Sequence, residues 1–189
     1  MNADAILRVT VALRERLKAA LTRSQVPGTV FVGPLDDPDA GGAALVLFLY
    51  RIAPSATLRN QEHRVVSAKP QTKVDVYRNS FPLDLYFLIT VGTTPGSSEE
   101  TLLKALGYAI QEIQNSPDLV GSDVAHETVH VTFEPLSTEE ASRIWALFPT
   151  ANYRTSIAYL ATPVWIDPPN AVTLPEPVGH HELNAGVQA

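Results

Sequence analysis

The chain opens with apolar residues spaced for one face of a helix. They recur three or four positions apart with charged residues between them, at Ile6, Val9, Leu13, Leu17 and Leu21. This spacing predicts an amphipathic helix from about residue 4 to residue 23, with Asp4 as its N-terminal cap. Pro27 and Gly28 then end the helix, and a short strand is expected at 29–32.

Several later segments have the pattern of β-strands. The continuous apolar run 44–52 is short and rich in β-branched and aromatic residues, which favours a strand covered on both faces. In 83–91 and 129–133, apolar residues alternate with polar ones, so each is predicted to form a strand with one face in the core. A last strand is expected from about residue 153 to residue 166.

Two further helices are predicted from the capping sequences at their N-termini. Residues 97–100 (SSEE) and 137–140 (STEE) both have the serine-to-glutamate spacing of a capping box, and apolar residues at helical spacing follow each. Helices and strands do not alternate strictly along the chain. We therefore predict an α+β fold, with a mostly antiparallel or mixed β-sheet flanked by about three helices.

The chain changes character after residue 166. Hydrophobic periodicity ends there, and no lysine or arginine follows Arg154. We therefore predict one domain over residues 1–166 and an extended, mildly acidic C-terminal arm over residues 167–189. Prolines keep this arm out of a central strand but leave it free to lie over a neighbour, so its candidate interface residues are Pro168, Pro169, Pro175 and Pro177.

Composition narrows the classes of function. The 189 residues are 45% hydrophobic and 18% charged, as in an ordinary globular protein. No apolar run reaches the roughly 20 residues of a membrane helix and no signal-peptide pattern is present, so we expect synthesis in the cytoplasm and no membrane partner. The net charge of -6 argues against a nucleic-acid partner. The absence of cysteine excludes disulfides and thiolate metal sites.

One segment is basic in this otherwise acidic chain. Between residues 55 and 81, a polar stretch that could hold a hairpin around residues 69–70, five basic residues face two acidic ones. Such a concentration of charge suits an acidic neighbouring surface. A solvated loop with incidental charge is the alternative. The candidate interface residues in this segment are Arg59, Arg64, Lys69, Lys73 and Arg78.

Residues 126–130 (HETVH) match the zinc-protease pattern. That motif requires a helix, which places both histidines one turn apart around the metal. Here the periodicity is that of a strand, which separates positions four apart by about 13 Å. We therefore expect no metal, no other cofactor and no catalytic residue, and we expect substitution of Glu127 to leave the fold unchanged. A zinc metalloprotease that uses His126, Glu127 and His130 is the enzyme alternative.

Four stretches resemble one protein family in their amino-acid sequence and in their order along the chain. They are residues 47–54 (LFLYRIAP) with 58–60 (LRN), 82–90 (PLDLYFLIT), 102–111 (LLKALGYAIQ), and 131–140 (VTFEPLSTEE) continuing through 143–145 to 153–159. Together they resemble the cap proteins of extracellular contractile injection systems of the antifeeding-prophage and virulence-cassette type, a family first catalogued as a domain of unknown function. The resemblance covers about residues 4–166.

The resemblance implies a structural role without catalysis. A member of this family is expected to have a phage tail-terminator-like fold, to form a homo-hexameric ring that ends the inner tube, and to contact the sheath. It would assemble in the cytoplasm and then belong to a particle that is released or kept inside the cell. The alternative is an adaptor that docks another particle component without forming a ring. The pairs Tyr50-Arg51 and Tyr153-Arg154 are expected to determine the fold.

Overall fold

A computed structural model of the chain describes residues 3–66, 74–125 and 127–174. Within these residues, three α-helices accompany a six-stranded mixed sheet and a smaller three-stranded sheet, which confirms the predicted α+β class. The helices are α1 (Ala5–Ser24), α2 (Glu99–Asn115) and α3 (Thr138–Ala146). Single 3-10 turns lie at Pro38–Ala40 and Ser122–Val124.

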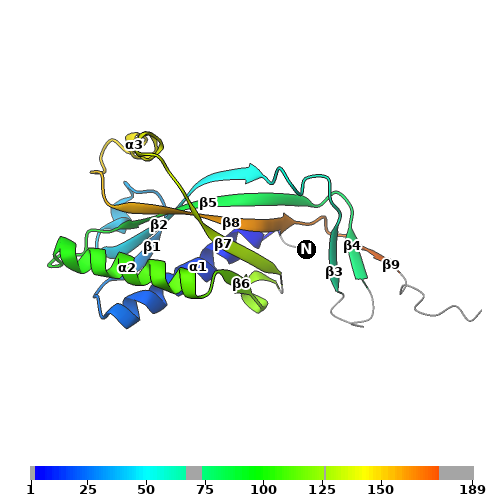
Figure 1. Cartoon of the computed structure of the whole chain (residues 1–189), viewed down its shortest axis with the longest axis horizontal. Helices are drawn as coiled ribbons and strands as arrows, with labels where there is room; N and C mark the ends of the chain where they lie inside the picture. Colours follow the sequence, from blue (N-terminus) through cyan, green and yellow to red (C-terminus); the bar gives the residue numbers. More distant parts are fainter. Residues whose placement is uncertain (1–2, 67–73, 126, 175–189) are drawn as a thin grey trace, which may run out of the picture.

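The large sheet has the strand order β1-β2-β5-β8-β7-β6 (Figure 1). Its strands are β1 (Thr29–Val32), β2 (Ala43–Pro54), β5 (Phe81–Val91), β6 (Asp118–Val120), β7 (Thr128–Glu134) and β8 (Ser156–Ile166). β1 runs parallel to β2, and the other neighbouring strands of this sheet are antiparallel. The sheet is therefore mixed but mostly antiparallel.

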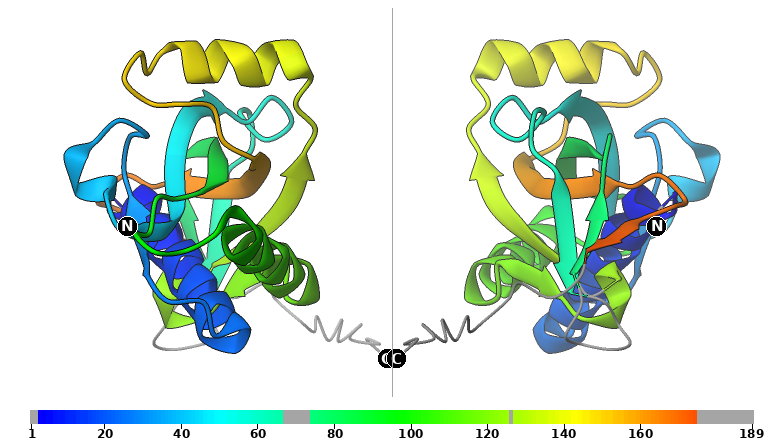
Figure 2. Two further views of the ribbon diagram at one scale, coloured as in Figure 1. Left: turned by 90° about the vertical axis from the view of Figure 1, so that its left-hand side faces the viewer. Right: turned by 90° about the vertical axis from the view of Figure 1, so that its right-hand side faces the viewer.

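Helices α1 and α2 cover one face of the large sheet, and α3 lies over the other (Figure 2). The side chains between the sheet and the helix pair are fully buried, among them Leu13 and Leu17 of α1, Ile113 of α2 and Phe87 of β5. Burying each of these large side chains stabilises the fold by roughly 1.5–3 kcal/mol. None of the helices in the described ranges combines the length and apolar character that a membrane crossing needs.

Three local predictions need correction. The strand β2 is buried on both faces only over its first half, and Ile52 in its second half is 47% exposed. Asp4 occupies the N-cap position of α1, but its side chain makes no capping hydrogen bond. Helix α2 begins one residue later than predicted. Its cap is therefore Ser98, which accepts from the Thr101 N–H, and no glutamate completes a box.

The small sheet lies at the opposite end of the molecule from α3 (Figure 1). It contains β3 (His63–Val66), β4 (Val74–Tyr77) and β9 (Val172–Leu174), in the antiparallel order β3-β4-β9. The pairing of β3 with β4 confirms the predicted hairpin, although its tip at 67–73 lies outside the described residues. Because β9 joins an edge of this sheet, the first part of the predicted arm takes part in the fold. Residues 175–189 are not described, so the division into 1–166 and 167–189 stays a prediction.

Gly92 allows a close approach of two backbone segments just after β5. Its N–H donates to the carbonyl oxygen of Ala44 at 2.8 Å. A Cβ atom added at Gly92 would lie 1.9 Å from the carbonyl oxygen of Ala43. Since this obstacle is backbone rather than a flexible side chain, the strands would have to separate to accommodate any larger residue.

We therefore expect Gly92→Ala to lower the free energy of unfolding by at least about 2 kcal/mol. The matched control is Gly107→Ala on α2, where an added Cβ meets nothing within 4 Å. This control should raise the free energy of unfolding by roughly 0.5–1 kcal/mol, because alanine is the better helix former. Urea unfolding of both variants measures the two effects, and equal stabilities would contradict the close approach.

Candidate functional site

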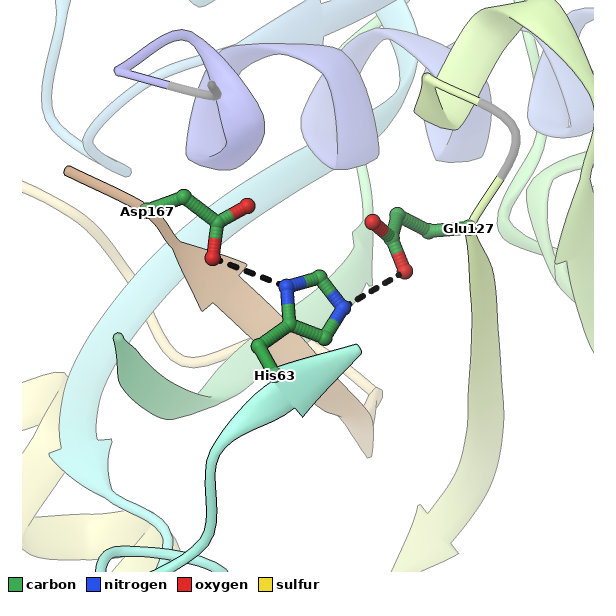
Figure 3. Close-up of side chains that lie close together, drawn as sticks. All are labelled: His63, Glu127 and Asp167. Carbon is green, nitrogen blue, oxygen red and sulfur yellow. Dashed lines mark hydrogen bonds and ion pairs between the residues drawn. The ribbon is translucent and has the colours of Figure 1, made fainter. Parts of the chain in front are cut away.

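A buried histidine joins the small sheet to the large one (Figure 3). His63 opens β3, Glu127 directly precedes β7, and Asp167 directly follows β8. The Nδ1 atom of His63 lies 2.8 Å from Oδ1 of Asp167, and its Nε2 atom lies 3.2 Å from Oε2 of Glu127. We call these three residues the His63 cluster. It ties the base of the β3–β4 hairpin to two strands of the large sheet.

The surroundings of the His63 cluster are aromatic and almost closed to solvent. The His63 ring stacks on Trp165 of β8 with centroids 4.5 Å apart and planes 6° apart, and it also stacks on Tyr77 of β4 at 6.1 Å. Ser80 donates a hydrogen bond of 2.8 Å to the same Asp167 oxygen that faces His63. His63, Ser80 and Asp167 are each only 6% exposed.

The geometry of the cluster favours a protonated imidazole. Burial by itself lowers the pKa of His63, but the hydrogen bonds to Asp167 and Glu127 and the charges of these carboxylates outweigh burial and raise the pKa from 6.5 to about 9. For Asp167, burial by itself raises the pKa. The hydrogen bonds from His63 and Ser80 outweigh burial and hold the pKa of Asp167 below its ordinary value of 3.8. The Trp165 ring adds a face that attracts a cation.

The cluster lacks the arrangement of a hydrolytic triad. In a triad the serine hydroxyl bonds to the histidine, and the histidine bonds to the carboxylate. Here Ser80 donates to Asp167, while the second nitrogen of His63 faces Glu127. The cavity beside Glu127 has a volume of about 10 Å³, room for a single water molecule and not for a substrate. The His63 cluster is therefore a structural ion-pair network.

The same three residues offer the donor types of a metal site, with one ligand atom of each lying within 4.8 Å of the others. A metal ion binds neutral imidazole through a nitrogen lone pair. In this cluster each ring nitrogen faces a carboxylate, an arrangement that an imidazolium satisfies with two N–H donors. The donor set therefore suits a proton better than a metal ion.

The zinc-protease pattern does not form the helix that its chemistry requires. Residues 128–134 are strand β7, and His126 lies outside the described residues. Glu127 turns toward His63, whereas His130 is exposed and pairs with Asp118 at 2.5 Å. The contact between Glu127 and the buried His63 argues against the expectation that substitution of Glu127 leaves the fold unchanged, and the effect of that substitution stays a prediction.

The structure describes part of the predicted interface. Arg59, Arg64 and Arg78 are exposed and lie in or beside the β3–β4 hairpin, with Arg64 ion-paired to Glu62 at 3.3 Å. Among the arm prolines, Pro168 is half-buried and Pro169 is exposed. The other candidates lie outside the described residues: Lys69, Lys73, Pro175 and Pro177. The basic segment is therefore carried at the end of the molecule that the His63 cluster holds in place.

Sequence reasoning missed the His63 cluster. Its members come from positions that share no motif, because Asp167 lies 104 positions and Glu127 64 positions after His63 in the sequence. The available signal is an acidic residue, Asp167, that directly follows the apolar end of a predicted strand. Such a position is a candidate for a buried carboxylate, but its partner could not be identified without the fold.

The sequence matches the protein family described as the Pvc16 N-terminal domain over residues 8–180. Two solved structures have the same fold. In the first, a PVC sheath/tube terminator of an extracellular contractile injection system, the matching chain is 16% identical with a TM-score of 0.59. In the second, the tube-terminating cap of the anti-feeding prophage, it is 19% identical, also with a TM-score of 0.59.

The match extends over nearly the whole of this chain but only part of the two solved ones. It covers 100% of this chain and 66% of the terminator, and 92% of this chain and 59% of the cap. The chain thus spans less than two thirds of either solved chain. No curated protein sequence is similar enough to this one to count as a match.

The pKa values predict how stability changes with pH. Because His63 has a folded pKa of about 9, above its ordinary 6.5, its contribution is complete below pH 6.5 and is lost as the pH rises through 9. The shift corresponds to a loss on the order of 3 kcal/mol in the free energy of unfolding between pH 6 and pH 10. The contribution of Asp167 to the free energy of unfolding has the opposite pH dependence. Because its pKa is lowered in the folded state, this contribution is present at neutral pH and is lost only in acid. Urea unfolding from pH 6 to pH 10 measures the alkaline slope of His63, and urea unfolding from pH 6 down into acid measures the slope of Asp167.

We further expect His63→Gln to remove most of the alkaline slope and to cost about 3 kcal/mol at pH 6, because it leaves two carboxylates without their cation. His130→Gln is the matched control, since His130 is an exposed histidine that pairs with one carboxylate. It should change stability by less than about 0.5 kcal/mol. Equal effects of the two substitutions would show that the His63 cluster does not stabilise the fold.

Proposed function

The chain belongs to the Pvc16 N-terminal domain family, and on this premise we propose that it is a structural cap. In this role it ends the inner tube and contacts the sheath at the distal end of a phage-tail-like contractile injection particle. The observation that carries the proposal is the shared fold along nearly the whole chain with a sheath/tube terminator and with a tube-terminating cap. Family membership and fold similarity support the proposal from separate comparisons.

We propose that the cap is a homo-hexamer. A subunit that ends a six-fold tube needs head-to-tail contacts that close after six steps, and a six-fold ring is what the resemblance to the cap family implies. Its partners would be the inner tube and sheath proteins, with no nucleic acid or membrane involved. Assembly would take place in the cytoplasm, after which the cap stays part of the particle. An adaptor that docks a component without forming a ring is the alternative, and it would be monomeric within the particle.

The proposed role needs no catalytic chemistry. The two solved proteins of the same fold are described by position in a particle, as a terminator and a cap. In the described part of this chain, the polar cluster that most resembles a catalytic site is buried and internally paired. Both observations favour a structural protein over an enzyme.

We propose that the exposed arginines around the β3–β4 hairpin contact an acidic surface of the tube or sheath. Arg59, Arg64 and Arg78 lie at one end of a molecule whose net charge is -6. A local positive surface of this kind raises the association rate and orients the partner more than it adds affinity. The half-buried Pro168 and exposed Pro169 pass beside the same small sheet on the way to β9, which makes them candidates for the same contact.

Removal of the gene from a particle-producing strain tests the main proposal. We expect particles whose tubes and sheaths vary in length or lack their distal closure, because nothing else would end the tube at the correct layer. Electron microscopy of purified particles measures the length distribution, and expression of the intact gene from a plasmid should restore it. Tubes that end at the correct length without the protein would contradict the proposal.

Charge reversal tests the hairpin contact. Replacing Arg59, Arg64 and Arg78 with glutamate should weaken binding of the purified cap to tube or sheath and reduce its dependence on salt. The matched control reverses three exposed charges on the helices, at Lys18, Lys104 and Arg143, and gives the same net charge. Pull-down at low and at moderate salt compares the two. If both variants bind equally well, the hairpin arginines do not make the contact.

A further inference from the structure

The large sheet contains a strip of four strands that is open along both edges. β1 pairs with β2 only over Ala43–Leu47, and β6 pairs with β7 only over Thr128–His130. Further along the sheet, the described residues are paired only across the four strands β2, β5, β8 and β7. Within the described residues, no main-chain segment pairs with the outer side of β2 after Leu47 or with the outer side of β7 after Val131. Unpaired edges of this kind readily accept another strand.

One row of this strip has outward-facing main-chain groups at both ends. It runs from Leu49 through Phe87 and Tyr159 to Phe133. At the β2 edge, Leu47 accepts a hydrogen bond from the Gly33 N–H, and at the β7 edge, the Val131 N–H donates to Pro117. Main-chain groups alternate sides along a strand, so the residues two positions further on face the same edges. The main-chain N–H and C=O groups of Leu49 and Phe133 therefore point outward from the two edges, at the two ends of the same row of paired residues.

The direction of the strands fits a head-to-tail arrangement of identical copies. β2, β5, β8 and β7 alternate in direction, so the two edges of the strip run opposite to each other. When a second copy is placed beside the first in the same orientation, its β7 edge meets the β2 edge of the first in antiparallel fashion. An even number of alternating strands is what makes this possible, and the contact is heterologous, as a ring requires.

The side chains at the two edges are complementary. Arg51 is exposed on β2, with its guanidinium 4.7 Å from the centre of the Tyr86 ring, and the acidic Glu134 stands at the end of β7. On the face toward α1 and α2, Phe133 is 53% exposed and would meet the partly buried Leu49. Pairing the edges would thus bring unlike charges together on one face and apolar side chains together on the other.

We propose that neighbouring copies of this chain join the free edge of β2 to the free edge of β7, so that the sheet continues from subunit to subunit. This inference rests on the proposed ring and specifies the surface that builds it. The partner is a second copy rather than another protein, because both complementary edges belong to the same chain and lie at the same level of one sheet.

Cysteine cross-linking in assembled particles tests the contact. The chain has no cysteine, so introduced pairs report without background. Arg51→Cys is combined in turn with Thr132→Cys, Phe133→Cys and Glu134→Cys, which scans the register. Within one chain these positions lie three strand spacings, about 14 Å, apart, too far for a disulfide. After mild oxidation, at least one pair should give a ladder of linked subunits that ends at six, and each single variant should stay monomeric on a denaturing gel.

The outcomes separate the inference from the function it rests on. Disulfide dimers of a single variant would indicate a two-fold contact and overturn the proposed pairing. Normal, capped particles with no cross-link in any register would also overturn it but leave the cap role intact. Tubes of correct length in the complete absence of the protein would contradict the cap role itself.

A charge swap decides the question if cysteine variants fail to assemble. Arg51→Glu should weaken association of the subunits about tenfold, and the double variant Arg51→Glu with Glu134→Arg should restore it. Thermal unfolding of both variants controls for damage to the fold. Folded variants that associate equally well with and without the second substitution would overturn the proposal.

Discussion

The relation between the two sheets depends on one buried imidazolium. Three segments that end or begin strands, at His63, Glu127 and Asp167, would separate if their charges were unpaired, because a buried carboxylate without a cation costs several kcal/mol. The apolar core of the large sheet fixes α1 and α2, but it does not extend to the β3–β4 hairpin. The hairpin is held by the His63 cluster and by stacking on Trp165. Its direction is thus set by the ion pairs and the aromatic stacking of His63.

A second constraint is the narrowness of the core. Two helices placed side by side cover the middle of the sheet, while the short strands β1 and β6 protect only half of each edge. With respect to the described residues, the second half of β2 and the end of β7 consequently keep unpaired main-chain groups, and both carry exposed apolar side chains. For a monomer such edges favour aggregation, whereas for a subunit of a closed ring they are contacts. The proposed assembly thus accounts for a feature that the fold alone leaves unexplained.

Much of the fold could be predicted because it depends on local patterns. The spacing of Leu13 and Leu17 predicts α1, and the Ser137–Glu140 capping box forms as expected at the start of α3. The site could not be predicted in this way. Glu127 lies in a sequence that matches a zinc-protease pattern, and the strand periodicity of that segment predicts no role for it. Its partner His63 is 64 residues away. Long-range ion pairs leave no periodic signal, so the burial of Asp167 is visible only once β8 and β3 are placed together.

The positions of these features suggest how one small subunit can serve a particle in several directions. Strand edges lie at the sides of the sheet, and contacts made through them run around a ring. The hairpin and its arginines lie at the end of the same strands, so their contacts point away from the ring. A change at the His63 cluster would alter the second set without touching the first, since the row from Leu49 to Phe133 is held by the apolar core. In the proposed cap, ring formation and attachment to the tube or sheath would therefore be separable by mutation.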